Sequence, residues 1–453
     1  MKYTKQVLLL WLGLIFIMSG PARAQVKPAG TLPPQATLQE CVEFALRNQP
    51  VIRQSLIDQE IGERNIRIGL SEWLPQIQGT ATYGHNLLLP TSVLPNFQDP
   101  AAGPQLVRVG LKNTSTLGLT GNQLLFNNDV LLAARSARFI RLRTSQNTTA
   151  FKIDVVTSVS KAFYDILLTQ EQLRILLEDI QRQERQVKDA QAQYDVGIVD
   201  KTDFLRASIS LKNAYAQRRT TAESLTGKYA SLKQLMGLSP ENKLALTYDT
   251  LQMAREVLLD TTTQLAYEKR IEVQQLQTQQ NLQRINIDYY RYGFLPSLNA
   301  YINYNRVYQN NNFSDLYSRA FPNSQTGLQL AVPIFTGTRR LQNLKIAQLQ
   351  QDRLDLDLYD TKNQINTEYQ QALATYKGAF NELNVLQQNL QDAKEVYRIL
   401  NLQYREGIRT FLDVIIAETD LRTAQLNYYN AMFNVLSSKL DVQRALGDIT
   451  FNP

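Results

Sequence analysis

Apolar residues repeat with the period of a helix over most of this chain, and with the period of a strand in four short stretches. Two helical patterns of roughly 70 residues would each be ~100 Å long at 1.5 Å per residue. They end at Gly197 and Gly407, and shorter helical patterns follow near Asp203 and Asp413. Glycine favours a left-handed helix end and aspartate favours a helix start. The pattern therefore predicts two long helical hairpins.

The two hairpins are repeats of one another. Their predicted tips, 194–203 and 404–413, share Tyr, Gly and Asp at one constant offset, since Tyr404 lies 210 positions after Tyr194. Apolar residues from Leu383 to Tyr404 step by three and four, and the earlier repeat keeps the same register. This seam is narrow and the other faces are polar. We therefore expect the helices to pack side by side in a thin layer that meets water on both faces.

Alternation of apolar and polar residues predicts two pairs of strands between the helical segments. The predicted strands span about 76–87, 106–125, 297–308 and 326–335. Each pair follows a Leu-Pro junction, Leu74-Pro75 in the first repeat and Leu295-Pro296 in the second. His85 lies on the first predicted strand, where we expect it to pack or to line a pore and not to bind a ligand.

The predicted domain organisation follows the duplication. It consists of a signal peptide at 1–24, a flexible leader at 25–36, a first repeat at 37–237, a connector at 238–262, a second repeat at 263–447 and a short C-terminal tail at 448–453. Two lysines, an apolar run from Val7 to Met18 and small residues on both sides of Arg23 indicate the signal peptide, and hence export. A capping box, Thr37-Leu38-Gln39-Glu40, predicts a helix directly after the leader.

Charge and composition argue against several functions. Without the three basic residues of the signal peptide, 45 Lys and Arg stand against 41 acidic residues, and a net charge of +4 is too small a bias to indicate nucleic acid. Cys41, the only cysteine, provides no disulfide framework and no thiol at the cleavage site for a lipid. One His, one Cys and no phosphate-binding glycine loop leave no basis for a metal site, a cofactor or an enzyme.

The number of strands bears on assembly. No stretch after the leader approaches about 18 consecutive apolar residues, so a membrane crossing would have to be made of β-structure. Closed membrane barrels use roughly eight or more strands because lipid does not tolerate open edges, and this chain offers four. A trimer would supply 12 strands. A soluble four-stranded sheet, or a periplasmic coiled-coil adaptor or scaffold protein, remains an alternative on the pattern alone.

The chain resembles TolC-family outer-membrane efflux proteins, also called outer membrane factors. The resemblance covers essentially all of the exported sequence and rests on the capping box, both Leu-Pro junctions, the duplication and both Tyr-x-x-Gly-x₅-Asp tips. It implies a mixed α and β fold of duplicated antiparallel coiled-coil hairpins plus four strands. It also implies a homotrimer that forms a 12-stranded β-barrel in the cell outer membrane, continuous with a helical periplasmic tunnel.

The resemblance further implies a passive exit duct. Its partners would be a periplasmic adaptor (membrane fusion) protein and an inner-membrane pump or exporter, which supplies the energy and selects the cargo. Bonds between the two hairpins hold the closed tip of the family. The matching gate residues in this chain are Thr202, Asp203, Tyr404 and Arg409.

The constriction and the adaptor contacts are likewise assigned by resemblance. The family places two acidic residues one helical turn apart at the constriction, and this chain matches the first with Asp413 but has Ile416 at the second. Three-fold symmetry would give one acidic ring and one apolar ring. Gly197 and Gly407 match the adaptor contacts. Residue types alone also allow helix capping by the tip acids and Thr202, a solvated Arg409, and a Tyr404 that belongs to the apolar seam.

Overall fold

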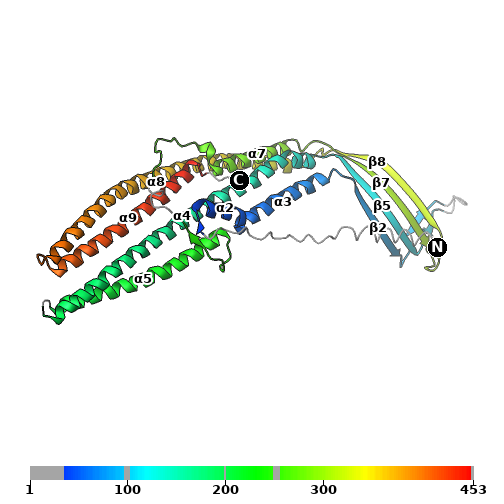
Figure 1. Ribbon diagram of the computed structural model, residues 1–453. Helices are drawn as coiled ribbons and strands as arrows, with labels where there is room; N and C mark the ends of the chain where they lie inside the picture. Colours follow the sequence, from blue (N-terminus) through cyan, green and yellow to red (C-terminus); the bar gives the residue numbers. More distant parts are fainter. Residues whose placement is uncertain (1–34, 96–102, 198–199, 248–255, 450–453) are drawn as a thin grey trace.

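The computed structural model describes residues 35–95, 103–197, 200–247 and 256–449. The predicted signal peptide at 1–24 lies outside these residues, as does the predicted leader up to residue 34. Figure 1 shows an elongated molecule, with the two helical hairpins at one end and a four-stranded sheet at the other. The predicted hairpin tips and the strands therefore lie at opposite ends of the molecule, with the helices between them.

The sheet joins the two repeats. Its strand order is β2-β5-β7-β8, and all neighbours are antiparallel. The strands are β2 (Gln76–His85), β5 (Asn113–Phe126), β7 (Ser297–Asn310) and β8 (Ala320–Ala331). Strands β5 and β7 pair across the middle of the sheet, so the first repeat and the second repeat meet there. Strands β2 and β8 form its two edges.

The two faces of the sheet differ in polarity. Side chains alternate between the faces along each strand, and the register aligns them across strands. One face is apolar and exposed, and includes Ile77, Leu117, Leu119, Ile302, Tyr304, Leu328 and Leu330. The opposite face carries uncharged polar groups, including Gln78, Thr80, Thr120, Asn303, Asn305 and Gln325. The alternation predicted from the sequence is thus present, and side chains of the apolar face are exposed.

The second predicted strand, 106–125, is wrong in its first part. It is divided into β4 (Gln105–Arg108), which pairs with β3 (Thr91–Leu94), and the longer β5. Gly110 lies between them at φ 108°, a backbone conformation that glycine adopts readily and that interrupts a ladder. The chain therefore adds a small hairpin at the end of the sheet that faces away from the helices.

The fourth predicted strand, 326–335, is displaced. Strand β8 begins earlier, at Ala320, and ends at Ala331, opposite Ser297. Its partner β7 starts at Ser297, and the preceding Pro296 has no N–H to donate. The apolar residues from Val332 to Phe335 continue the alternation without a partner strand. The predicted strand is therefore too long at its C-terminal end.

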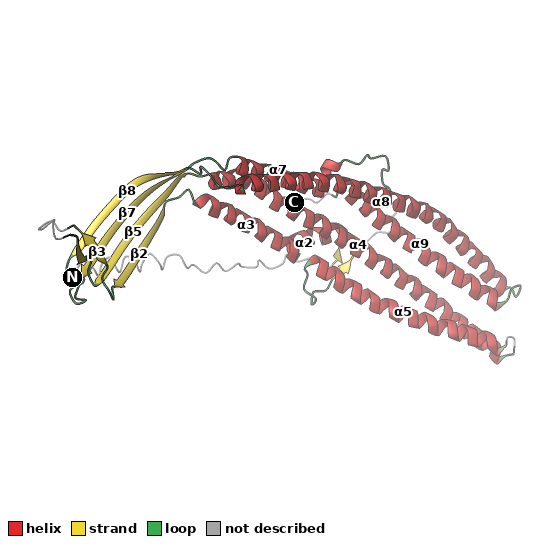
Figure 2. Ribbon diagram, turned by 180° about the vertical axis from the view of Figure 1, so that it is seen from behind, coloured by secondary structure: helices red, strands yellow, loops and turns green. Residues whose placement is uncertain are grey.

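The predicted hairpins are confirmed. The first consists of α4 (Asn128–Asp195) and α5 (Lys201–Met236), and the second of α8 (Arg339–Arg405) and α9 (Phe411–Leu446). Figure 2 shows that α5 and α8 form opposite margins of the helical layer, and α4 contacts α9 between them. Within the described residues, no helix combines the length and the apolar character that crossing a membrane requires.

Three shorter helices flank the long ones on the side of the sheet. They are α2 (Leu38–Asn48), α3 (Pro50–Ser71) and α7 (Ile271–Arg291). The predicted capping box is confirmed, because the Thr37 side chain accepts from the Glu40 backbone while the Glu40 carboxylate accepts from the Thr37 N–H. These helices continue the layer toward the strands, with α3 beside α4 and α7 between α4 and α8.

The start of α7 differs from the prediction. The second repeat is predicted to begin at 263, but its first long helix, α7, begins at Ile271 after a short 3-10 turn, η3 (Tyr267–Lys269). Arg270 has an extended backbone, and its buried guanidinium donates to the Ala445 carbonyl and forms ion pairs with Glu272 and Glu368. These bonds hold Arg270 beside the C-terminal end of α9, and α7 begins at the next residue.

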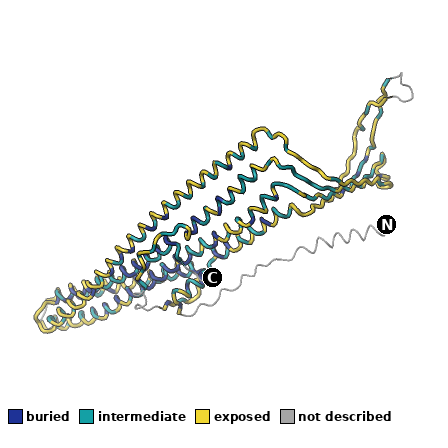
Figure 3. The backbone as a smooth tube through the Cα atoms, turned by 90° about the horizontal axis from the view of Figure 1, so that it is seen from above, coloured by how far each residue is buried: buried dark blue, intermediate teal, exposed yellow. Residues whose placement is uncertain are grey.

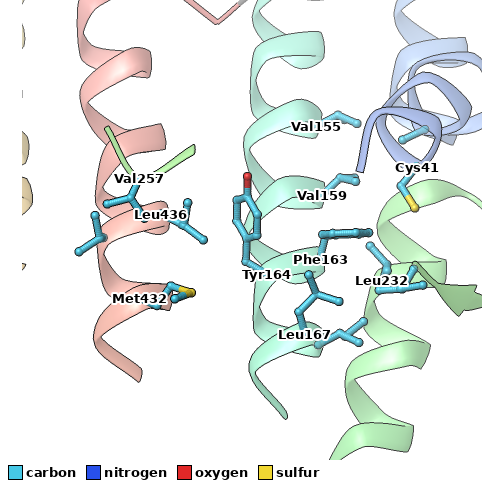
Figure 4. Packing of buried hydrophobic residues seen from close by; sticks show 14 of the residues in the cluster. Cys41, Val155, Val159, Phe163, Tyr164, Leu167, Leu232, Val257, Met432 and Leu436 are labelled. Carbon is cyan, nitrogen blue, oxygen red and sulfur yellow. The ribbon is translucent and has the colours of Figure 1, made fainter. Parts of the chain in front are cut away.

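The main core lies where the hairpins meet the connector. Figure 4 shows α4 packed on two sides, with Phe163 facing α2 and α5 and Tyr164 facing α9. Connector residue Val257 is also buried there. The leader is not flexible over its whole predicted length, because β1 (Gln35–Ala36) pairs in parallel with β6 (Ala245–Leu246) of the connector. The described parts of the connector, on both sides of 248–255, therefore contribute to the core.

The positions of the predicted heptad seams are buried or half-buried, apart from Tyr194, which is 38% exposed. Leu176, Ile180 and Ala190 are buried in α4, and Leu383 and Leu390 are buried in α8. Figure 3 shows that burial is concentrated in the middle of the molecule, whereas the tips and much of the sheet are exposed. The layer is thin, as predicted, and most of its outward faces meet water.

Candidate functional site at the hairpin tips

Glycines end both long helices in the conformation that the sequence predicted. Gly197 has φ 73° and Gly407 has φ 74°. At the second tip the Gly407 N–H donates to the Tyr404 carbonyl (3.0 Å), and the Ile408 N–H donates to the Gln403 carbonyl (2.8 Å). This pair of bonds is the Schellman motif, which satisfies the last carbonyls of a helix. Part of the first tip, 198–199, lies outside the described residues.

The return helices begin at other residues than those expected. Asp200 caps α5 by accepting from the Thr202 N–H (3.0 Å), so Asp203 lies inside the first turn and is not the cap. Thr410 caps α9. Asp200 and Thr410 occupy equivalent positions in the two repeats. The two return helices thus start at matching positions, one capped by a carboxylate and the other by a hydroxyl.

Asp413 completes the cap of α9. Its carboxylate accepts from the Thr410 N–H (3.1 Å) and hydroxyl (2.9 Å), while its own N–H donates to Thr410 Oγ1 (3.4 Å). The hydrogen bond from the Thr410 side chain, followed by that from its backbone, lowers the pKa of Asp413 below the usual value for aspartate. The group therefore remains charged at neutral pH and carries a negative charge at the tip.

Tyr404 connects the two hairpins. Its ring packs against Phe411 with centroids 5.7 Å apart, and its hydroxyl donates to Gln193 Oε1 at 3.2 Å. Ala190, Ala207 and Phe411 form the buried centre of this contact. Burial raises the pKa of Tyr404; the Gln193 bond opposes this shift, while the charges of Asp189 and Asp203 add to it. Tyr404 therefore lies near Asp203 but is bonded to Gln193.

Arg409 is exposed at the second tip. Its Nε donates to Gln403 Oε1 at 3.4 Å. Among the described residues, no hydrogen bond or ion pair joins Arg409 to Thr202 or Asp203. The structure thus brings Tyr404 to the first hairpin within one chain, but it does not bring Arg409 there.

Other predicted residues occupy distinct surroundings. Ile416 lies one turn beyond Asp413 on α9 and is 51% exposed. His85 is at the end of β2, where its Nδ1 lies 2.7 Å from Asn113 Oδ1. Over the described ranges, no group of three or more His, Cys, Asp or Glu residues is placed to hold a metal ion.

Sequence reasoning missed the role of two glutamines. Gln193 accepts the Tyr404 hydroxyl bond, and Gln403 accepts from Arg409. A signal for both was present, because each glutamine directly precedes the repeated tyrosine. The two repeated glutamines thus have different roles: Gln193 bonds to the other hairpin, whereas Gln403 bonds within its own.

A group of buried charges above the tips was also missed. Asp179 and Arg182 on α4 and Glu418 and Arg422 on α9 are connected by ion pairs. The sequence pattern predicts that the charged residues of these helices lie on the faces that meet water. Asp179, Arg182 and Gln186 follow steps of three and four, but other polar residues on these helices do so too, and their spacing alone does not distinguish them.

Comparison with known proteins agrees with this architecture. A family model described as outer membrane efflux protein matches residues 42–238 and 262–448. The outer membrane protein TolC of Vibrio cholerae is 22% identical over 419 residues, covering 91% of each chain. The alkaline protease secretion protein AprF of Pseudomonas aeruginosa is 22% identical, covering 87% of this chain and 81% of its own.

A solved structure has the same fold. The Campylobacter jejuni CmeC outer membrane channel superposes with a TM-score of 0.70 at 17% identity, covering 91% of this chain and 85% of that one. The two segments matched by the family model together take in both repeats, both hairpins and all four strands of the sheet. This chain belongs to the outer membrane efflux protein family.

Proposed function

We propose that three copies of this chain form a passive duct in the outer membrane, through which cargo delivered by an inner-membrane pump or exporter leaves the cell. The observation that carries the proposal is a four-stranded sheet with an exposed apolar face and two open edges, continued by helices of 68 and 67 residues. Lipid tolerates an apolar face but not an open edge.

Neighbouring protomers would pair with the two open edges of the sheet. Strands β2 and β8 are the sheet edges, and three copies can pair each β8 with the β2 of a neighbour to make 12 strands. The margins of the helical layer also expose some apolar side chains among their charged ones. Exposed residues there include Ile57, Ile61 and Ile68 on α3, and Leu349 and Leu356 on α8. Contact between protomers would cover these side chains.

The polarity of the sheet gives the orientation of the proposed barrel. Its apolar face would meet lipid, and its face of amides and hydroxyls would line the lumen. A soluble adaptor or scaffold protein would use the same long helices, but it would leave the apolar face of the sheet in water. The duct therefore fits the described surface better than the alternative.

We further propose that the hairpin tips are the gate and the contact for a periplasmic adaptor. Tyr404 lies close to the charge of Asp203, and Arg409 is exposed. In a trimer, Arg409 can reach Thr202 and Asp203 of a neighbouring protomer and form charge-assisted hydrogen bonds, worth about 1.5–3 kcal/mol each when shielded from water. Gly197 and Gly407 would expose the tip backbone to the adaptor.

Reconstitution tests the duct directly. Full-length protein expressed in a Gram-negative host should be recovered in the outer-membrane fraction as a trimer that heating dissociates. In planar lipid bilayers it should give discrete ion currents of constant step size. Recovery in the soluble periplasm, or a pure trimer that conducts no ions, would contradict the proposed function.

Replacement of Asp413 by alanine should weaken block of the channel by divalent cations from the periplasmic side. The physical reason is that three-fold symmetry would place three carboxylates around one narrow opening, with an apolar ring at Ile416 beside them. Current block at rising divalent concentration measures the effect, and a several-fold weakening is expected. Glu406→Gln, which removes another exposed acid of the same tip, is the control. Equal block in Asp413→Ala and the original protein would exclude this ring.

A further inference from the structure

Four charged side chains join the two hairpins just above the tips, beginning with Glu418, which is two residues beyond Ile416 on α9. Arg182 Nε lies 2.8 Å from Glu418 Oε1, and Arg422 Nη1 lies 2.9 Å from Asp179 Oδ2. Arg182 also approaches Asp179, with Nη2 and Oδ1 at 3.2 Å. Asp179 and Arg182 belong to α4 and the other two to α9. We name these four residues the α4–α9 charge cluster.

The cluster is inside the helical layer. The Asp179 side chain is fully buried, and the Glu418 side chain is 5% exposed. Two glutamines add to these bonds, since Gln183 donates to Asp179 Oδ2 (2.9 Å), which also accepts from Arg422, and Gln186 donates to Glu418 Oε2 (2.8 Å). Two acids and two bases therefore neutralise each other, with both carboxylates buried and the Arg182 and Arg422 side chains 21% and 26% exposed.

Paired charges of this kind can hold α4 and α9 together and still allow the two helices to separate. Moving ions out of water is costly, and their mutual attraction often does little more than offset that cost. Burial raises the pKa of Glu418, although its bonds from Arg182 and Gln186 act in the opposite direction. When α4 and α9 separate, the charges regain water, whereas an apolar seam would expose hydrocarbon. Separation at this level is thus easier than at the apolar levels of the same seam.

The cluster is not reproduced at the equivalent positions of the duplication. The counterparts of Asp179 and Arg182 are Asn389 and Asp392 on α8, and those of Glu418 and Arg422 are Ser208 and Lys212 on α5. Helices α8 and α5 are the two margins of the layer and would meet between protomers. The paired charges are therefore specific to the contact between the two hairpins of one protomer.

We propose that the α4–α9 charge cluster is a second, reversible closure point that restricts how far the two hairpins of each protomer separate when the tip opens. With the cluster intact, opening involves only the segments between it and the tips. With the cluster separated, the hairpins move apart from a higher level and the pore widens further. This inference rests on the proposed duct and concerns Arg182 and Glu418 as positioning residues, which act through the helices that carry the tip.

Single-channel recording of Glu418→Gln in the full-length trimer tests the proposal. The variant keeps the shape of the side chain and removes the charge that pairs with Arg182. The ratio of time spent in the larger to the smaller conductance level should rise about tenfold, as expected when a two-state equilibrium loses one charge-assisted contact. The matched control is Glu395→Gln, which removes an exposed acid paired with Arg398 within α8 alone.

A double variant separates this role from simple structural support. Arg182→Met with Glu418→Leu replaces the ion pair by apolar contacts, which often stabilise a buried site. The larger conductance level should then become rarer than in the original protein, the opposite of the effect of Glu418→Gln. Loss of general stability would instead change both variants in the same direction. Thermal dissociation of the trimer, measured in parallel, records that stability.

The outcomes are distinct. An original protein that forms no channel contradicts the duct itself. A normal channel whose conductance levels are the same in Glu418→Gln, or change equally in Glu395→Gln, overturns only the role of the cluster. If Glu418→Gln does not assemble, Arg182→Lys takes its place, since it keeps the charge but loses the forked donor geometry; a smaller rise in the same ratio is expected, and no rise overturns the proposal.

Discussion

Replacement of Phe163 by alanine is expected to destabilise the folded protein by about 3–5 kcal/mol, the usual range for removing a large aromatic side chain from a core. Phe163 is 3% exposed and packs in the main core, on the side of α4 that faces α2 and α5. Its removal leaves a cavity between elements from both ends of the first repeat. Urea-induced loss of tertiary structure in detergent solution measures the change.

The same helix provides the control. Phe151 lies three helical turns before Phe163 on α4 and is 39% exposed. Phe151→Ala removes the same atoms but little buried contact, so the expected destabilisation is below about 1 kcal/mol. Both substitutions raise helix propensity equally, so similar losses for the two variants would contradict packing of Phe163 in the core as the source of its larger effect.

Much of the fold could be predicted because its signals are local. Apolar residues spaced by three and four predicted the long helices, and the repeated glycines predicted where they end. Gly197 and Gly407 both adopt the left-handed conformation. Duplication strengthened each inference, since two independent stretches had to agree in spacing.

The strand boundaries were less predictable because alternation does not record where a partner strand ends. Val107 and Leu111 keep the period of two across a break in the ladder, although Gly110 between them offered a sign of it. Ile334 likewise continues an alternation that has no partner beyond Pro296. Strand pairing depends on two segments, whereas the alternation of apolar and polar residues describes only one of them.

The helix starts at the tips show another limit. The repeated Asp203 and Asp413 suggested two aspartate caps, whereas the caps are Asp200 and Thr410. Different residue types can perform the same capping function, so identity between repeats indicated the wrong position. The gate assignment of Thr202, Asp203, Tyr404 and Arg409 stays a prediction, because contacts between protomers decide it.

The charge cluster could not be predicted from periodicity. Asp179 and Arg422 are separated by 243 residues, and polar residues at seam spacing occur along much of both hairpins. Burial depends on which distant helix covers a position, and a wet helix face has the same composition. The sequence therefore indicated that charges were present but not that α9 encloses some of them.

Replacement of Gly237 by alanine is expected to destabilise the protein by about 3 kcal/mol, through two separate effects. Gly237 ends α5 at φ 67°, and a side chain in the left-handed region costs roughly 1–2 kcal/mol. A Cβ would also lie 2.6 Å from the Asn48 carbonyl oxygen and 3.0 Å from Gln49 Cα. These are backbone atoms between α2 and α3, and overpacking typically adds 1–3 kcal/mol.

Two other glycines separate these effects. Gly197 has a similar φ of 73°, but a Cβ there would meet nothing within 4 Å, so Gly197→Ala should show the conformational cost alone. Gly227 is inside α5 in open space, and Gly227→Ala should stabilise the helix by roughly 0.5–1 kcal/mol. Thermal unfolding of the three variants should therefore rank Gly237→Ala as least stable and Gly227→Ala as most stable. Equal losses at Gly237 and Gly197 would show that the end of α5 can move away from the α2–α3 junction; the predicted difference requires that contact to be rigid.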